Sequence, residues 1–127
     1  MRPTAFGYPE DMDKAAKGAI VERLRTKFVA EKMPELLGYM RRHLEAAGGQ
    51  FFCGDKPTIA DCNVLPMLRA FQAGHIDFVP TTCLDKYPVI TAWIARMMAI
   101  PAVKAWYEKQ AARKAAKAAA KAAAAEK

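Results

Sequence analysis

Long apolar runs are missing from this chain of 127 residues. No stretch approaches the roughly 18 apolar residues that a membrane-spanning helix needs, which excludes a transmembrane protein. The N-terminal segment also lacks the apolar core of a secretory signal, so we expect a protein that is not exported. Cysteine is scarce: Cys53, Cys62 and Cys83 are odd in number and form no CxxC pair. This pattern predicts reduced thiols in a cytoplasmic protein, with neither a disulfide framework nor a metal site.

The alternation of apolar and polar residues that marks a strand is absent as well. The apolar stretch QFFCG at residues 50–54 is too short and isolated to build a sheet. Residues 11–47 instead carry apolar residues at four-residue spacing, as at Ile20 and Leu24, which predicts a helix. Pro34 should kink or divide this helix, because proline removes a hydrogen-bond donor and crowds the preceding turn. The sequence therefore predicts an all-α fold.

A strong helix-start signal lies in the stretch GDKPTIADCN at residues 54–63. Thr58 can cap the first free amides of a helix with its hydroxyl, and the carboxylate of Asp61 can accept from the amide of Thr58. These two residues predict a structural capping box. The helix that follows, at residues 59–73, is apolar on nearly every face and is expected at the centre of a bundle, with Asn63 buried.

Two prolines divide the rest of the folded part. Pro88 is expected to open a helix whose inward face includes Trp93 and Met97, and Pro101 is expected to begin a short last helix. Residues 109–127 are low in complexity, since eleven of these nineteen residues are alanine. Alanine favours the helix, so this segment can extend the last helix, but it cannot pack a core, and we expect a frayed, solvated helix or disorder there.

The net charge of +7 is unevenly distributed. Residues 109–127 carry six Lys or Arg residues and a single Glu, whereas residues 1–108 carry fourteen cationic and twelve acidic residues. The folded part is therefore nearly neutral, which argues against nucleic-acid binding by the domain itself. We divide the chain into a helical domain at 1–108 and a basic tail at 109–127.

Four stretches resemble the C-terminal, all-helical domain of cytosolic glutathione transferases, most closely the pi, mu, alpha and sigma branch. They are MRPTAFGY (1–8), EKMPELLGYM (31–40), GDKPTIADCN (54–63) and CLDKYPVITAWIARMMAIPAVKAW (83–106). The resemblance implies a helical bundle over residues 1–108. Family members begin with a thioredoxin-like domain and most of a first helix, and neither is found in this sequence.

The resemblance implies a detoxifying transferase that conjugates the thiol of glutathione, its co-substrate, to small hydrophobic electrophiles. In the family, glutathione binds mainly to the thioredoxin-like domain, which also holds the residue that activates the thiol. No residue of this sequence is therefore assigned a catalytic role, and this chain alone is expected to be inactive. The complete enzyme is expected to be a cytoplasmic homodimer without membrane contact and without a cofactor besides glutathione.

The helical domain of the family supplies one wall of the electrophile pocket. Phe6 and Tyr8 fall near the segment that lines this wall, so the resemblance implies that they bind the substrate; local packing is the alternative. Tyr8 is suited to stack on an aromatic electrophile or to donate a hydrogen bond to it. His43 and His75 are expected to be solvated, without a catalytic role. The alternative function is a non-catalytic helical interaction module in a translation-type assembly, whose basic tail contacts RNA or acidic partners.

Overall fold

The computed structural model describes residues 12–125. The helical elements follow in the order α1 (Lys14–Lys27), η2 (Phe28–Lys32, a π-helical turn), α2 (Met33–Ala46), α3 (Ile59–Gln72), α4 (Pro88–Ala99) and α5 (Pro101–Ala125). Within this part of the chain, β-pairing is limited to an isolated bridge between Phe51 and Gly54. The all-α fold predicted from the sequence is confirmed.

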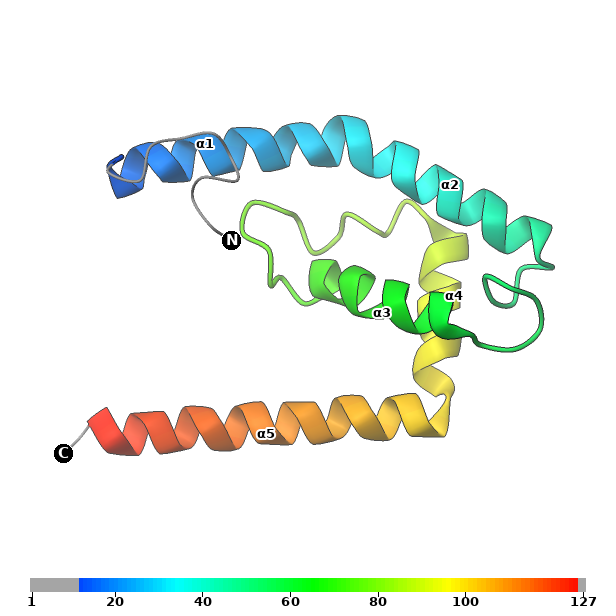
Figure 1. Cartoon of the computed structure of the whole chain (residues 1–127). Helices are drawn as coiled ribbons and strands as arrows, with labels where there is room; N and C mark the ends of the chain where they lie inside the picture. The colour runs from blue at the N-terminus through cyan, green and yellow to red at the C-terminus, as the bar shows by residue number, and fades with distance from the viewer. Residues whose placement is uncertain (1–11, 126–127) are drawn as a thin grey trace.

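α1, η2 and α2 form one long bent helix that crosses the top of Figure 1. Asp13 caps its start, because the carboxylate accepts hydrogen bonds from the amides of Ala15 and Ala16 at 2.9 and 3.1 Å. The π-helical turn η2 ends just before Pro34, whose nitrogen has no hydrogen to donate to the preceding turn. The helix is therefore divided next to Pro34, as predicted, and the division takes the form of a π-helical turn.

α2 ends at two glycines. Gly48 and Gly49 have φ angles of 90° and 78°, in the left-handed region that other residues rarely adopt. The amide of Gly49 donates to the carbonyl of Leu44 at 2.6 Å and satisfies one of the last free carbonyls of the helix. The chain then turns back through residues 50–57 into α3.

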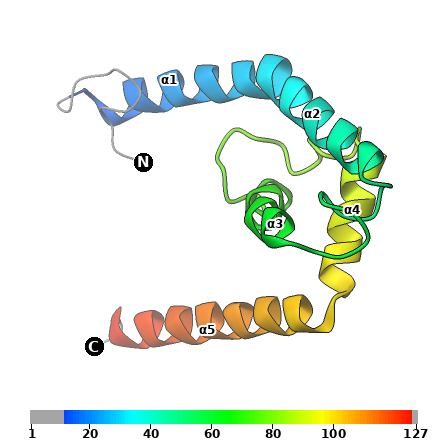
Figure 2. The same ribbon diagram turned by 45° about the vertical axis from the view of Figure 1, so that its right-hand side comes forward.

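The helices are arranged in the shape of the letter C, and α3 lies inside it (Figures 1 and 2). α1 and α2 form the upper arm, α4 forms the back and α5 forms the lower arm.

α4 and α5 meet at 85°. Pro101 begins α5, and this helix is not short: it has 25 residues, because the alanine-rich segment extends it to Ala125. Among residues 12–125 no single helix is long and apolar enough to cross a membrane, although α4 and α5 taken as a bent pair pass the same test of length and composition.

The hydrophobic core lies where α2, α3 and α4 meet. Trp93 of α4 is fully buried there, together with Leu44 of α2 and Leu68 of α3. The buried apolar side chains are Met33, Leu37, Leu44, Phe51, Leu65, Leu68, Phe71, Val79, Leu84, Ile90, Trp93, Ile94 and Met97. Full burial of one such large side chain contributes about 1.5–3 kcal/mol, so this cluster is the main source of stability.

α3 is less enclosed than its composition predicts. Leu65 and Leu68 are buried, but Ile59 is 78% exposed and Met67 is 44% exposed. Asn63, which the sequence places in the interior, is also exposed. Both expectations are wrong within the described part of the chain, because the backbones of α3 and α5 do not come close and one side of α3 stays open (Figure 2).

Candidate functional site

The start of α3 carries a capping box formed by Thr58 and Asp61. Thr58 has an extended backbone and stands just before the helix. Its amide donates to Oδ2 of Asp61 at 2.9 Å, and its hydroxyl lies 3.1 Å from the same oxygen. The cap fixes the point at which the loop becomes a helix.

The second carboxylate oxygen of Asp61 contacts two elements outside α3. Oδ1 accepts hydrogen bonds from the amide of Phe52 at 3.1 Å and from the indole N–H of Trp93 at 2.9 Å. The rings of Phe52 and Trp93 also pack edge to face, with centroids 5.1 Å apart. Sequence reasoning missed both donors; the available signal was the inward position of Trp93 on its helix. Asp61 therefore joins α3, the preceding loop and α4.

The charge of Asp61 is balanced by its hydrogen bonds. Burial raises the pKa of this carboxyl, but the bonds from Thr58, Phe52 and Trp93 together outweigh burial and hold the pKa below its ordinary value of 3.8. The carboxylate is thus ionised at neutral pH. Its side chain is fully buried and both oxygens are engaged, so Asp61 is not available to a ligand.

An apolar groove with a volume of about 370 Å³, which we call the α3–α5 groove, lies between α3, α4 and α5. Its lining residues are Cys62, Leu65, Pro66, Met97, Ala102, Val103, Trp106 and Tyr107. Trp106 is 53% exposed at the groove and packs edge to face against Tyr107, with centroids 4.9 Å apart. The size and lining are typical of a small-molecule site.

Tyr107 lines both this groove and a neighbouring cleft that contains Arg69. Its hydroxyl is buried and has no hydrogen-bond partner among residues 12–125. The guanidinium of Arg69 lies over the Tyr107 ring, 5.4 Å from the centroid. Burial raises the pKa of Tyr107 and outweighs the opposing effect of Arg69, so the phenol remains protonated at neutral pH.

A second cleft, of about 440 Å³, lies between the η2 region and the loop that leads to α4. Cys83 is half-buried in its wall. Burial and the nearby Asp85 raise the pKa of this thiol, which is the opposite of what a nucleophilic cysteine requires. Phe78, at the same cleft, has a φ of 61°, which is an uncommon conformation for a bulky residue.

Of the residues singled out in the sequence, the structure brings Thr58 and Asp61 together in the capping box. Phe6 and Tyr8, the expected substrate-binding residues, lie outside the described residues. His43 and His75 are both exposed, and Nε2 of His75 lies 3.2 Å from Nζ of Lys114 on α5. In the range 12–125, no group of three His, Cys, Asp or Glu side chains is placed to hold a metal ion.

Comparison with known proteins identifies the family. The family profile described as "Glutathione S-transferase, C-terminal domain" matches residues 6–110. The chain belongs to this family. The resemblance seen in the four sequence stretches is therefore confirmed, and the helices α1 to α4 together with the start of α5 are its helical domain.

The curated relatives include pi-type enzymes. "Glutathione S-transferase P" of Bos taurus is 38% identical over 60 residues, which cover 46% of this chain and 26% of the relative. "Glutathione S-transferase P 1" of Xenopus laevis is 30% identical over 92 residues, covering 71% of this chain and 41% of the relative. "Glutathione S-transferase-like protein OpS6" of Beauveria bassiana (strain ARSEF 2860) is 34% identical over 78 residues, covering 61% of this chain and 34% of the relative.

The match thus spans between about a quarter and two fifths of the length of these relatives. No solved structure gives a significant match.

Proposed function

We propose that this chain acts as the helical domain of a glutathione transferase that conjugates glutathione to small hydrophobic electrophiles. The observation that carries the proposal is the match of residues 6–110 to the C-terminal domain of these enzymes. In this arrangement a thioredoxin-like domain binds glutathione and activates its thiol. The helical domain binds the electrophile.

The chemistry requires an ionised thiol held next to an electrophilic carbon. For an aryl chloride, a sulfur–carbon bond forms, the carbon–chlorine bond breaks, chloride leaves and the thiol proton passes to solvent. An apolar wall contributes by orienting the electrophile and excluding water, which lowers the barrier without any proton transfer by the wall itself. The α3–α5 groove supports this role, because its lining is apolar.

The perturbed groups of the described residues do not suit thiol activation. Burial raises the pKa of the Cys83 thiol, and both carboxylate oxygens of the buried Asp61 are engaged in hydrogen bonds, so neither group is suited to act as the base that takes the thiol proton. This supports a division of labour in which the thiol is activated outside residues 12–125. We further propose that Phe6 and Tyr8 contact the electrophile, and that the complete enzyme is a cytoplasmic homodimer.

The test measures conjugation of glutathione to a chloronitrobenzene. The chain alone is compared with a fusion in which the thioredoxin-like domain and first helix of the bovine relative precede it, and the bovine enzyme is the positive control. We expect no activity above the uncatalysed rate for the chain alone and clear activity for the fusion. A fusion that folds and binds glutathione agarose but does not conjugate contradicts the proposal. Activity of the chain alone contradicts the division of labour.

A second candidate is a non-catalytic helical interaction module in a translation-type assembly. The observation that favours it is α5, whose cationic residues continue beyond the matched range. Co-purification of the tagged chain with translation proteins, together with an inactive fusion, supports this candidate over the enzyme.

A further inference from the structure

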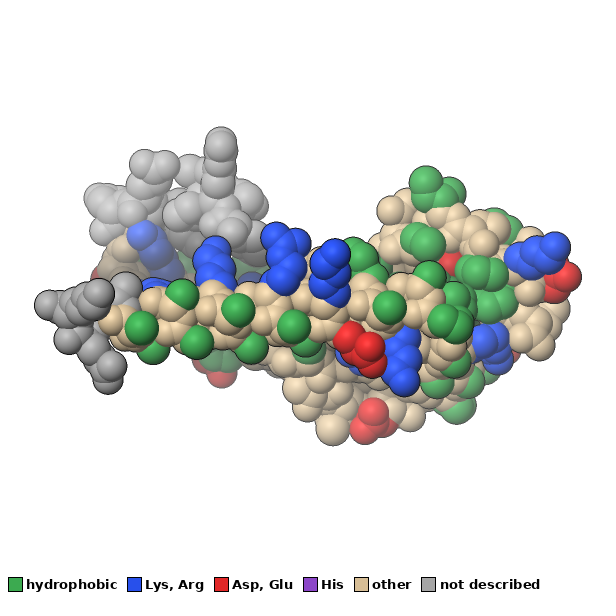
Figure 3. Space-filling view, turned by 90° about the horizontal axis from the view of Figure 1, so that it is seen from below, with side chains coloured by type: hydrophobic (Ala, Val, Ile, Leu, Met, Phe, Trp, Pro, Cys, Tyr) green, Lys and Arg blue, Asp and Glu red, His purple; other side chains and the backbone are tan. Residues whose placement is uncertain are grey.

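α5 carries a row of four cations that we call the α5 stripe: Lys109, Arg113, Lys117 and Lys121. Residues four apart in a helix lie on nearly the same face, with a rise of about 6 Å between them. All four residues are exposed. Figure 3 shows Lys and Arg side chains gathered along one edge of this helix.

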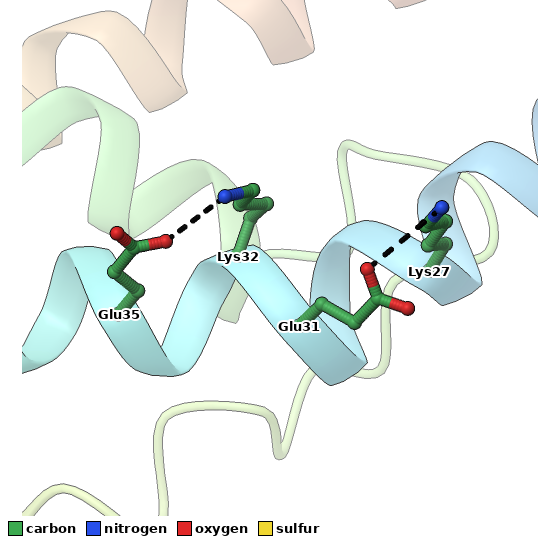
Figure 4. A network of polar contacts seen from close by, with 4 residues as sticks. All are labelled: Lys27, Glu31, Lys32 and Glu35. Atoms are coloured by element: carbon green, nitrogen blue, oxygen red, sulfur yellow. Dashed lines mark hydrogen bonds and ion pairs between the residues drawn. The ribbon is translucent and has the colours of Figure 1, made fainter.

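Other cations of the chain are paired with acids at helical spacing, as Figure 4 shows. Lys27 lies 3.9 Å from Glu31, and Lys32 lies 3.1 Å from Glu35. In contrast, the described residues provide no hydrogen bond or ion pair to any cation of the α5 stripe, and residues 109–125 contain no acidic residue.

The positive charges of the α5 stripe repel one another. Like charges at four-residue spacing destabilise a helix, and here three successive pairs do so. The alanines between them favour the helix and offset this repulsion. A partner that brings a regular row of negative charges would relieve the repulsion along the whole stripe.

We propose that the α5 stripe binds the phosphate backbone of nucleic acid without regard to base sequence. Apart from Gln110 and Lys114, the other residues at 109–123 are alanine, so this part of the helix lacks the large apolar anchors that hold an amphipathic helix in a bilayer. It also lacks the aromatic residues on which protein interfaces depend. Lysine and arginine at regular spacing suit repeated phosphates.

The proposal is independent of the proposed catalytic function. The family match ends at residue 110, so only Lys109 of the α5 stripe lies inside the matched range. Lys114, the other cation of this segment, already lies 3.2 Å from Nε2 of His75 and is not counted in the stripe. Three of the four cations of the α5 stripe therefore lie beyond the part of the chain that matches the transferase family.

The experiment measures binding of the full chain to a fluorescent 20-base-pair duplex of mixed sequence by anisotropy, at salt concentrations from low to physiological. Four phosphate contacts predict a slope of about −3.6 when the logarithm of the binding constant is plotted against the logarithm of the salt concentration. Each contact contributes about −0.9 to this slope. A second duplex of unrelated sequence should bind equally well. Absence of binding at low salt overturns the proposal, as does tighter binding to phosphatidylserine vesicles.

A charge-relocated variant separates the α5 stripe from net charge. Lys117→Ala and Lys121→Ala are combined with Ala115→Lys and Ala119→Lys, which keeps composition and charge but moves two cations to the opposite face. We expect the slope to flatten by about 1.8 and the affinity to fall roughly tenfold or more, with unchanged helicity by circular dichroism. Equal binding by this variant shows that net charge alone acts and overturns the proposal. Lys104→Gln, on α5 but off the stripe, is the matched control and should bind like the wild type.

Discussion

Trp93 donates its indole N–H to Oδ1 of Asp61 over 2.9 Å, although 32 positions separate the two residues in the chain. Both side chains are fully buried. The hydrogen bond fixes α4 against the start of α3, and the capping box on the other carboxylate oxygen fixes the helix start itself. One buried carboxylate thus sets both the local structure of α3 and its packing.

The first prediction compares Thr58, which takes part only in the cap, with Asp61, which also accepts hydrogen bonds from Phe52 and Trp93. Thr58→Ala should lower the free energy of unfolding by about 1 kcal/mol, the usual effect of losing a cap. Asp61→Ala should lower it by about 3 kcal/mol or more, because the buried donors on Phe52 and Trp93 are left without an acceptor. The cap by itself would give the two substitutions similar effects.

Urea melts followed by circular dichroism measure both variants and the double variant. The double variant should lose less than the sum of the single losses, because the two side chains share one capping box. Asp55→Ala, an exposed acid in the same loop, is the matched control and should change the stability little. Strictly additive losses contradict the shared cap.

The second prediction concerns pH. Because the folded state lowers the pKa of Asp61 below 3.8, the ionised carboxylate contributes stability above about pH 4. This contribution is lost as the pH falls through the folded-state pKa. The free energy of unfolding of the wild type should therefore approach that of Asp61→Asn as the pH is lowered below about 4. Two stability curves that stay parallel down to pH 2.5 rule out a lowered pKa for Asp61.

The third prediction concerns the end of α5. Removal of residues 111–127 should change the melting temperature by less than about 3 °C, because residues 111–123 are exposed and an exposed Lys114–His75 contact contributes little. Removal of residues 103–127 should lower it much further, because Val103 and Tyr107 pack against the core. Differential scanning calorimetry distinguishes the two truncations. A large effect of the shorter truncation means that the end of α5 packs on the domain.

The fourth prediction rests on the proposed function. In the active fusion, Tyr8→Ala should reduce kcat/KM toward aromatic electrophiles roughly two- to tenfold, the effect of losing one aromatic contact. The affinity for glutathione should stay nearly the same. Tyr39→Ala is the control, because Tyr39 is a 49% exposed tyrosine on α2. Equal losses for aromatic and aliphatic electrophiles argue against a stacking role of Tyr8.

Much of the helical layout follows from local chemistry that the sequence shows directly. Pro88 and Pro101 begin helices because proline fits the first turn, where its missing N–H is not needed. Gly48 and Gly49 end α2 because they adopt positive φ without strain. Thr58 and Asp61 form a cap because three-residue spacing places both at the helix end. Each of these features depends on neighbours within a few residues.

The tertiary structure decided the rest, because it depends on which faces meet. α3 has apolar residues all round, but Ile59 and Met67 are exposed where no other described helix covers them. The long-range bond between Asp61 and Trp93 has no counterpart in local spacing. The 85° turn between α4 and α5 places Trp106 at the open groove between α3 and α5. Local signals specify where helices begin and end, whereas burial and long-range hydrogen bonds depend on packing between helices far apart in the chain.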